Sequence, residues 1–216
     1  MHKATAVVHI SPAGGALFTQ YTAELEPGGT LPPPAEQRFL YVLAGSVTID
    51  TTRLETGGFA YLPPGHEALV TSAAASRIAV IEKPYEELDE VAAPGFLAGR
   101  ESAVSPSHLN DDPWLEVRSL LPDAPGFDFR VNTMTYQPGA SLPAVESHVM
   151  EHGLLMLEGA GIYRLGDAWH PVTAGDFIWM APYCPQWFGA LGKQPAKYRS
   201  EEHTSELQSR GLISYA

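Results

Sequence analysis

The chain contains a single cysteine, Cys184, among its 216 residues. One thiol excludes an internal disulfide framework and is typical of a reducing compartment, so we expect a cytoplasmic location. No apolar run approaches the roughly 20 residues that span a bilayer, and residues 1–15 lack the apolar segment of a secretory signal. We therefore expect no membrane association.

Basic residues are also scarce. The chain has 13 Lys and Arg against 25 Asp and Glu, which gives a formal net charge of −12. This balance repels phosphate and argues against a nucleic-acid partner. With 44% hydrophobic and 18% charged residues, the composition is that of a globular protein. A small polar molecule is the expected ligand.

Long stretches with helical periodicity are missing as well. Glycine (20) and proline (19) are scattered, and short runs of apolar, aromatic and β-branched residues lie between them. These runs are Phe39–Leu43, Phe59–Leu62, Ile78–Ile81, Leu154–Leu157 and Phe177–Met180. Such runs, bounded by Gly and Pro, predict strands of an all-β sandwich or barrel.

The chain repeats its own pattern. Residues 39–47 (FLYVLAGSV) align with residues 153–161 (GLLMLEGAG), and residues 57–68 align with residues 175–186. The strand, the glycine and the Pro-rich turn recur at a nearly constant offset, which indicates an internal duplication.

The repeat predicts the domain organisation. We expect an N-terminal domain over residues 1–90, a polar, acidic linker over residues 91–114 and a C-terminal domain over residues 115–199. Residues 200–216 begin with SEEHTSELQSR, which looks like translated sequencing-adapter sequence. We expect this tail to be extraneous.

A Gly-bounded strand pair followed by a Gly–strand–Pro turn resembles the two motifs of the cupin family. The second copy matches their spacing from Gly139 to Gly159 and from Gly175 to Gln186. The resemblance implies an all-β fold of two tandem jelly-roll barrels, a bicupin, with the first barrel shortened at its N-terminus. Gln186 stands where the family usually carries a histidine ligand.

Residues 145–153 (VESHVMEHG) contain three candidate metal ligands within seven residues. They are Glu146, His148 and His152. A helix is one interpretation, since Pro143 suits a first turn. A zinc-protease helix, however, needs Glu directly after the first His, and Val149 stands there. In the repeated context we expect an extended segment that turns these side chains inward.

Together with Gln186, these side chains form the predicted metal-ligand set. Two imidazoles, a carboxylate and an amide in one barrel interior are hard to satisfy by burial alone, whereas a divalent cation offsets the desolvation. A metal-free polar network is the alternative. Oxygen and nitrogen donors without thiolate favour Mn²⁺ or Fe²⁺, with Ni²⁺ or Zn²⁺ as substitutes. For Cys184 we favour a small buried apolar role over ligation.

The first copy provides an internal comparison. The corresponding positions there fall on Pro32, Pro34, Arg38 and Ala68, none of which is a metal ligand. We therefore expect the N-terminal barrel to be metal-free and structural.

Among bicupins the chain resembles the (S)-ureidoglycine aminohydrolase family. The residues that carry the resemblance are 39–45, 61–65, 126–128, 136–141, 146–153, 161–163 and 175–180. The resemblance implies a manganese enzyme of purine (allantoin) catabolism that releases ammonia from (S)-ureidoglycine to give (S)-ureidoglycolate. It also implies that Tyr163 and Tyr198 hold the substrate and that the protein forms a homo-oligomer.

One position departs from this family. The lysine that holds the substrate there falls at Glu202, a reversal of charge. We expect metal binding to survive and catalysis to be weakened, and we assign no general acid or base. Two other functions remain open: an Fe²⁺-dependent cupin dioxygenase or isomerase, which would consume oxygen, and a non-catalytic bicupin that binds a small acid.

Overall fold

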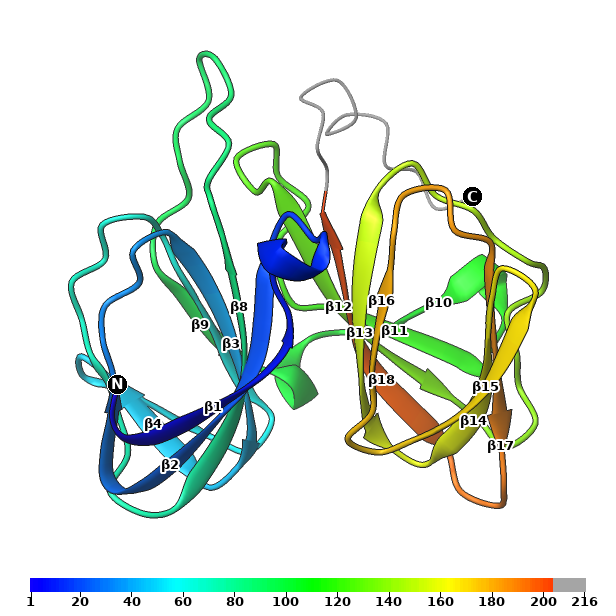
Figure 1. Ribbon diagram of the computed structural model, residues 1–216, viewed down its shortest axis with the longest axis horizontal. Coiled ribbons are helices and arrows are strands. Elements are labelled where there is room, and N and C mark those ends of the chain that lie inside the picture. The colour runs from blue at the N-terminus through cyan, green and yellow to red at the C-terminus, as the bar shows by residue number, and fades with distance from the viewer. Residues whose placement is uncertain (204–216) are drawn as a thin grey trace. The chain divides into compact units, whose positions relative to one another are not determined.

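The computed structural model describes residues 1–203, which fold mainly as strands with a few short 3₁₀ turns (Figure 1). The all-β prediction is confirmed. The chain divides into two compact units, Met1–Ala103 and Val104–Ala216. Within the described residues, no helix has the length and apolar character needed to cross a membrane.

The first unit is one antiparallel sheet. Its elements are β1 (His2–Ile10), η1 (Pro12–Gly14), β2 (Thr19–Leu31), β3 (Gln37–Ala44), β4 (Ser46–Ile49), β5 (Thr52–Glu55), β6 (Gly58–Leu62), β7 (Val70–Thr71), β8 (Ser76–Lys83), β9 (Leu97–Arg100) and η2 (Glu101–Ala103). The strands follow the order β5-β4-β7-β2-β8-β3-β6-β9, with β1 paired to β2. Alternate residues of these strands, such as Leu40 and Val42 of β3, are buried in a single apolar core.

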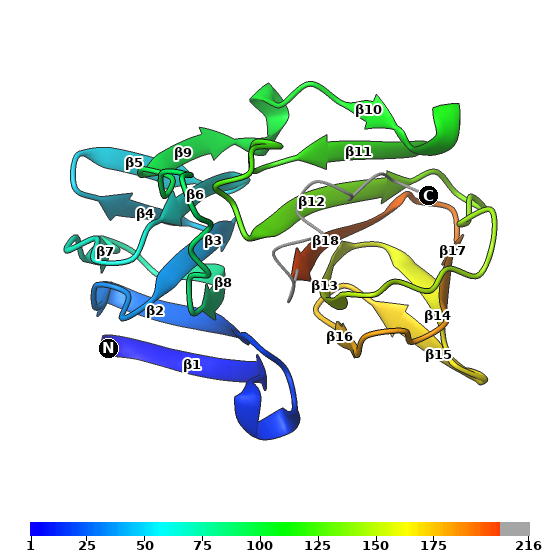
Figure 2. The same cartoon turned by 90° about the horizontal axis from the view of Figure 1, so that it is seen from above.

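The second unit contains two sheets. Its elements are β10 (Ser107–His108), η3 (Leu109–Asp111), β11 (Leu115–Ser119), β12 (Phe129–Tyr136), β13 (Glu151–Glu158), β14 (Ala160–Leu165), β15 (Ala168–Thr173), β16 (Phe177–Met180), β17 (Gln186–Leu191) and β18 (Ala196–His203). Among the described residues the sheet orders are β10-β11-β12-β18-β13-β16 and β15-β14-β17. Figure 2 shows β12, β18 and β13 side by side.

The two units share one pattern of strand pairing. The pairs β2–β8, β3–β8, β3–β6, β4–β5 and β4–β7 of the first unit recur as β12–β18, β13–β18, β13–β16, β14–β15 and β14–β17. The repeat visible in the sequence thus has a counterpart in the strand connectivity.

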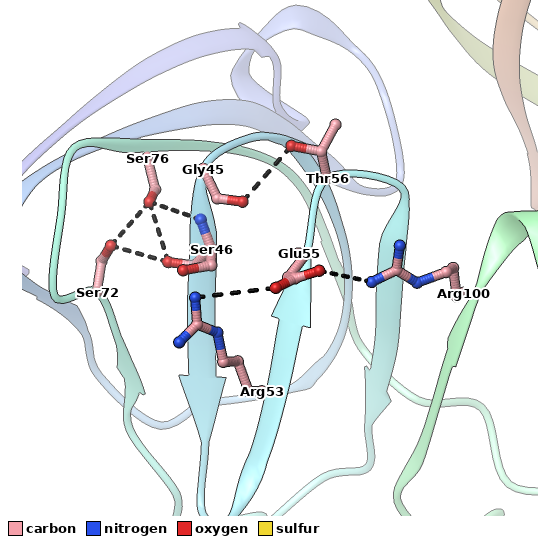
Figure 3. A network of polar contacts seen from close by, with 8 residues as sticks. All are labelled: Gly45, Ser46, Arg53, Glu55, Thr56, Ser72, Ser76 and Arg100. Carbon is pink, nitrogen blue, oxygen red and sulfur yellow. Dashed lines mark hydrogen bonds and ion pairs between the residues drawn. The ribbon is translucent and has the colours of Figure 1, made fainter.

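The repeated glycines occupy equivalent turns. Gly45 lies between β3 and β4, and Gly159 lies between β13 and β14, with φ of 81° and 70°. A Cβ atom would lie 2.4 Å from Ser76 Oγ at Gly45 and 2.3 Å from the Pro195 carbonyl oxygen at Gly159. At Gly45 the space is taken because Ser76 Oγ accepts a 3.1 Å hydrogen bond from the Ser46 backbone N–H (Figure 3). Only glycine suits both the backbone angle and the close approach.

Two segments differ from the sequence-based expectation. Within residues 91–114, expected as a linker, β9 pairs with β6 in the first unit and β10 pairs with β11 in the second. The strand β18 continues to His203, past the predicted end at residue 199, because its backbone is paired with β12 on one side and with β13 on the other. Residues 204–216 of the predicted extraneous tail lie outside the described residues.

Candidate functional site

The segment that carries Glu146, His148 and His152 is not helical, as predicted, but residues 147–150 form a loop with bends instead of the expected strand. Only His152 belongs to a strand, at the start of β13. Glu146 forms an isolated bridge with Gln186, in which each backbone N–H donates to the other residue's carbonyl oxygen at 2.8 Å. The His148 carbonyl oxygen accepts a 2.7 Å hydrogen bond from the Tyr183 N–H. Backbone bonds to the loop and strand start at 183–186 therefore position Glu146 and His148.

A cavity of about 240 Å³ opens in the second unit. All six predicted site residues line it: Glu146, His148, His152, Gln186, Tyr163 and Tyr198. The apolar side chains Met134, Leu142 and Leu154 form part of its wall. Cys184 packs against the apolar core of the same unit. The structure thus brings the predicted ligands and the predicted substrate-binding residues together.

The two imidazoles differ in their surroundings. Nε2 of His148 lies 3.3 Å from Oε2 of Glu146, and this hydrogen bond raises the pKa of His148. The His148 and His152 rings lie 4.7 Å apart between centroids. Burial, with a smaller contribution from His148, lowers the pKa of His152 to about 3. His152 is therefore neutral near pH 7, which is the form that ligates metals.

The buried polar atoms of the site favour an ion. His152 is 5% exposed, and its Nε2 has no hydrogen-bond partner among the described residues. Leaving such an atom unsatisfied costs about 1–3 kcal/mol. A cation that accepts the imidazole lone pair would remove this cost.

The arrangement is not a preformed cage. Within residues 1–203, no three His, Cys, Asp or Glu side chains stand together as a complete metal cluster. Glu146, His148 and His152 therefore line one cavity without meeting at a single point, and the fourth candidate donor, the amide of Gln186, is 5% exposed. Borderline nitrogen and hard oxygen donors without thiolate are the types that Mn²⁺ and Fe²⁺ accept. The donor chemistry and the unsatisfied His152 nitrogen therefore fit a divalent cation.

Three buried tyrosines surround the ring of Phe188. The Tyr163 hydroxyl donates a 2.5 Å hydrogen bond to Oε1 of Gln186, and the Tyr136 and Tyr198 hydroxyl oxygens lie 2.6 Å apart. Rings of Tyr136 and Tyr198 meet Phe188 edge-on, with centroids 4.9 and 5.4 Å from it. Burial raises the pKa of all three phenols, so they are neutral hydroxyl groups near pH 7.

One row of β18 faces the cavity. Tyr198, Ser200 and Glu202 all line it, as the period of two in a strand requires. Burial raises the pKa of Glu202, the position where the family resemblance places a lysine. Asn132 of β12 lines the same wall. The sequence reasoning missed Asn132 and Ser200, although the alternation on β18 is a signal that continues past Tyr198.

Comparison with known proteins gives the family. A cupin domain model matches residues 132–200. The (S)-ureidoglycine aminohydrolase of Escherichia coli (strain K12) is 32% identical over 201 residues, which cover 88% of this chain and 77% of that protein. The chain belongs to the (S)-ureidoglycine aminohydrolase family. The resemblance noted from the motifs is thereby confirmed.

A second relative and a solved structure extend the comparison for this (S)-ureidoglycine aminohydrolase family member. The (S)-ureidoglycine aminohydrolase of Arabidopsis thaliana is 39% identical over 203 residues, covering 88% of this chain. The chain spans only 65% of that relative's length. The crystal structure of the E. coli protein Ylba is similar, with a TM-score of 0.82 and 28% identity over 94% of this chain and 84% of that one.

Proposed function

We propose that this chain hydrolyses (S)-ureidoglycine to (S)-ureidoglycolate and ammonia. The observation that carries the proposal is the convergence of Glu146, His148, His152 and Gln186 on one small cavity, in a chain of the (S)-ureidoglycine aminohydrolase family. A cavity of about 240 Å³ suits a small acid rather than a polymer.

We also propose that these four side chains hold Mn²⁺, for which Fe²⁺, Ni²⁺ or Zn²⁺ can substitute. The unsatisfied, buried Nε2 of His152 supports this ligand set. When bound, the ion would act as a Lewis acid and would fix the orientation of the substrate.

The remaining lining residues have distinct tasks in this proposal. The substrate loses its amine as ammonia and gains a water-derived hydroxyl group at the same carbon, so protons must be shared close to that carbon. Tyr163 and Tyr198 are neutral and buried, and they bind the substrate through their hydroxyl groups. Met134 and Leu154 limit the water around the reacting atoms.

For the first unit we propose a second cupin barrel without a metal. Its strand pairing matches that of the second unit. Its equivalent of a ligand position, Arg38, is 3% exposed, donates to Oε1 of Glu82 at 2.7 Å and to the Pro32 carbonyl oxygen at 2.8 Å. The positively charged guanidinium of Arg38 thus occupies the place that a metal ion would take in the first unit.

We further propose that Glu202 weakens the activity of this chain. A carboxyl group that faces the cavity opposes the substrate carboxylate, which a lysine would attract.

The cytoplasmic location and the homo-oligomer are proposals too. The single cysteine supports the first, and bicupin relatives suggest the second. Light scattering on the purified chain measures the subunit number directly.

The decisive experiment measures ammonia release. Metal-stripped protein is mixed with freshly made (S)-ureidoglycine, with and without Mn²⁺, in parallel with a version that carries a family-type C-terminus. We expect Mn²⁺-dependent release above the buffer rate, stronger in the restored version. A restored protein that binds Mn²⁺ but releases ammonia no faster than buffer would overturn the assignment. Oxygen uptake with Fe²⁺ would favour the dioxygenase, and binding without turnover would favour the non-catalytic bicupin.

A further inference from the structure

Two polar side chains outside the predicted site face the cavity from neighbouring strands. Asn132 of β12 and Ser200 of β18 are directly paired in the antiparallel ladder. Paired residues project to the same face of a sheet. Both residues line the cavity, and their exposed fractions are only 3% and 7%.

Neither side chain has a hydrogen-bond partner among residues 1–203. Buried amides and hydroxyls are normally hydrogen-bonded, and those that are not usually meet a water or a ligand. Because both side chains open into the cavity, a molecule that enters it can supply their hydrogen-bond partners.

The chemistry of the pair indicates what that molecule presents. The Asn132 amide offers two N–H donors and a carbonyl acceptor, and the Ser200 hydroxyl offers one donor and two lone pairs. A carbamoyl group, H₂N–C(=O)–NH–, presents the complementary carbonyl oxygen and N–H donors. A carboxylate only accepts hydrogen bonds, so it would leave the Asn132 carbonyl oxygen without a donor.

We propose that Asn132 and Ser200 form a subsite that binds the carbamoyl end of the substrate. The inference rests on the proposed function, in which the substrate has a ureido group, and it assigns the residues that select this group. Metal ligands and tyrosines bind the other end of the substrate.

The test compares two ligands that differ in one group. N-carbamoylglycine and N-acetylglycine carry NH₂ and CH₃, respectively, on the same carbonyl carbon. Binding of each to the Mn²⁺-loaded full chain is measured by calorimetry. A site built to hydrogen-bond the NH₂ group should favour N-carbamoylglycine by about tenfold or more, because the analogue leaves buried polar atoms unpaired.

Variants show which residues cause the preference for N-carbamoylglycine over N-acetylglycine. Asn132→Leu should reduce it to within about twofold, and Ser200→Ala should reduce it partly. Ser119→Ala is the matched control, because Ser119 faces Asn132 across β11 and β12 but is exposed and does not line the cavity. The control should keep the wild-type preference.

The outcomes separate this inference from the proposed function. Equal affinity for the two ligands in the wild type, or no binding of either, overturns the carbamoyl subsite even if ammonia is released from ureidoglycine. A preference that survives in Asn132→Leu, shown to be folded by its circular dichroism, also overturns it. A preference lost in Asn132→Leu supports the subsite even if no variant releases ammonia, and in that case only the aminohydrolase assignment fails.

Discussion

The hydroxyl group of Tyr163 donates a hydrogen bond of 2.5 Å to Oε1 of Gln186. Both side chains are almost fully buried, at 1% and 5% exposure. The same amide oxygen is the atom of Gln186 that would ligate the metal. The hydrogen bond from Tyr163 therefore fixes the orientation of a proposed metal ligand. Hydrogen bonds of this kind commonly contribute tenfold to hundredfold to metal affinity.

Tyr163→Phe should therefore weaken Mn²⁺ binding about tenfold, because the amide of Gln186 loses the bond that orients it. Competition with a chelator of known affinity measures the change. Tyr136→Phe is the matched control, since its hydroxyl group contacts Tyr198 and no proposed ligand. Equal loss in the two variants would show that packing, and not ligand orientation, explains the effect.

His152→Leu should separate metal binding from folding. In metal-free protein, removing the unpartnered Nε2 should leave the free energy of unfolding unchanged or raise it by about 1 kcal/mol. Saturating Mn²⁺ should stabilise the wild type, by about 2.7 kcal/mol at a hundredfold excess over Kd, and should not stabilise the variant. Thermal unfolding in EDTA and in Mn²⁺ checks both, with the exposed His170→Leu as control. Mn²⁺ stabilisation that persists in His152→Leu would exclude His152 as a ligand.

Glu202→Lys should raise kcat/KM for (S)-ureidoglycine at least about tenfold, because a cation replaces a carboxyl group that faces the cavity. Glu202→Gln should give an intermediate value. Glu158→Lys changes the net charge equally at an exposed residue of β13 and should have little effect. If Glu202→Lys leaves the rate unchanged, the weakened activity has another cause.

Gly159→Ala should destabilise the chain by more than about 2 kcal/mol, since it adds a backbone clash to the cost of a positive φ. Gly166→Ala is the comparison, because φ is 55° there and nothing lies within 4 Å of the added Cβ. Its cost should be about 1 kcal/mol. Urea denaturation of both variants measures the difference, and equal losses would contradict the close approach at Pro195.

Glu82→Ala should destabilise the protein by about 2–3 kcal/mol, because Arg38 stays buried without its carboxylate. Glu24→Ala, which breaks the exposed Glu24–Arg77 pair, should change stability by less than about 0.5 kcal/mol. Neither variant should alter the metal content of one Mn²⁺ per chain, measured by atomic spectroscopy. A second metal lost in Glu82→Ala would refute the metal-free first unit.

Much of the architecture was predictable from local pattern. The apolar runs Phe39–Leu43 and Phe177–Met180 form β3 and β16, because short Gly- and Pro-bounded runs leave the strand as the element that buries them. The glycines at 45 and 159 were predictable as equivalent turns, because their spacing repeats. The cavity also gathers the six site residues chosen from motif positions.

What escaped prediction depends on contacts between distant segments. The Glu146–Gln186 bridge joins residues far apart in the chain, so no local pattern shows that β13 begins only at Glu151. The polar composition of residues 200–203 suggested the end of a strand, but pairing on both sides extends β18. Asn132 and Ser200 are ordinary strand residues until their register places them on one wall.

The proposed metal ligands and the inward-facing residues of β18 come from different parts of the chain. Glu146 and His148 lie in a loop, and His152 and Gln186 start other strands, whereas Tyr198, Ser200 and Glu202 alternate along one strand. Substitutions along that strand alone can therefore change the substrate preference without altering any proposed metal ligand. Selectivity for the substrate and affinity for the metal can therefore change independently, in evolution or by design.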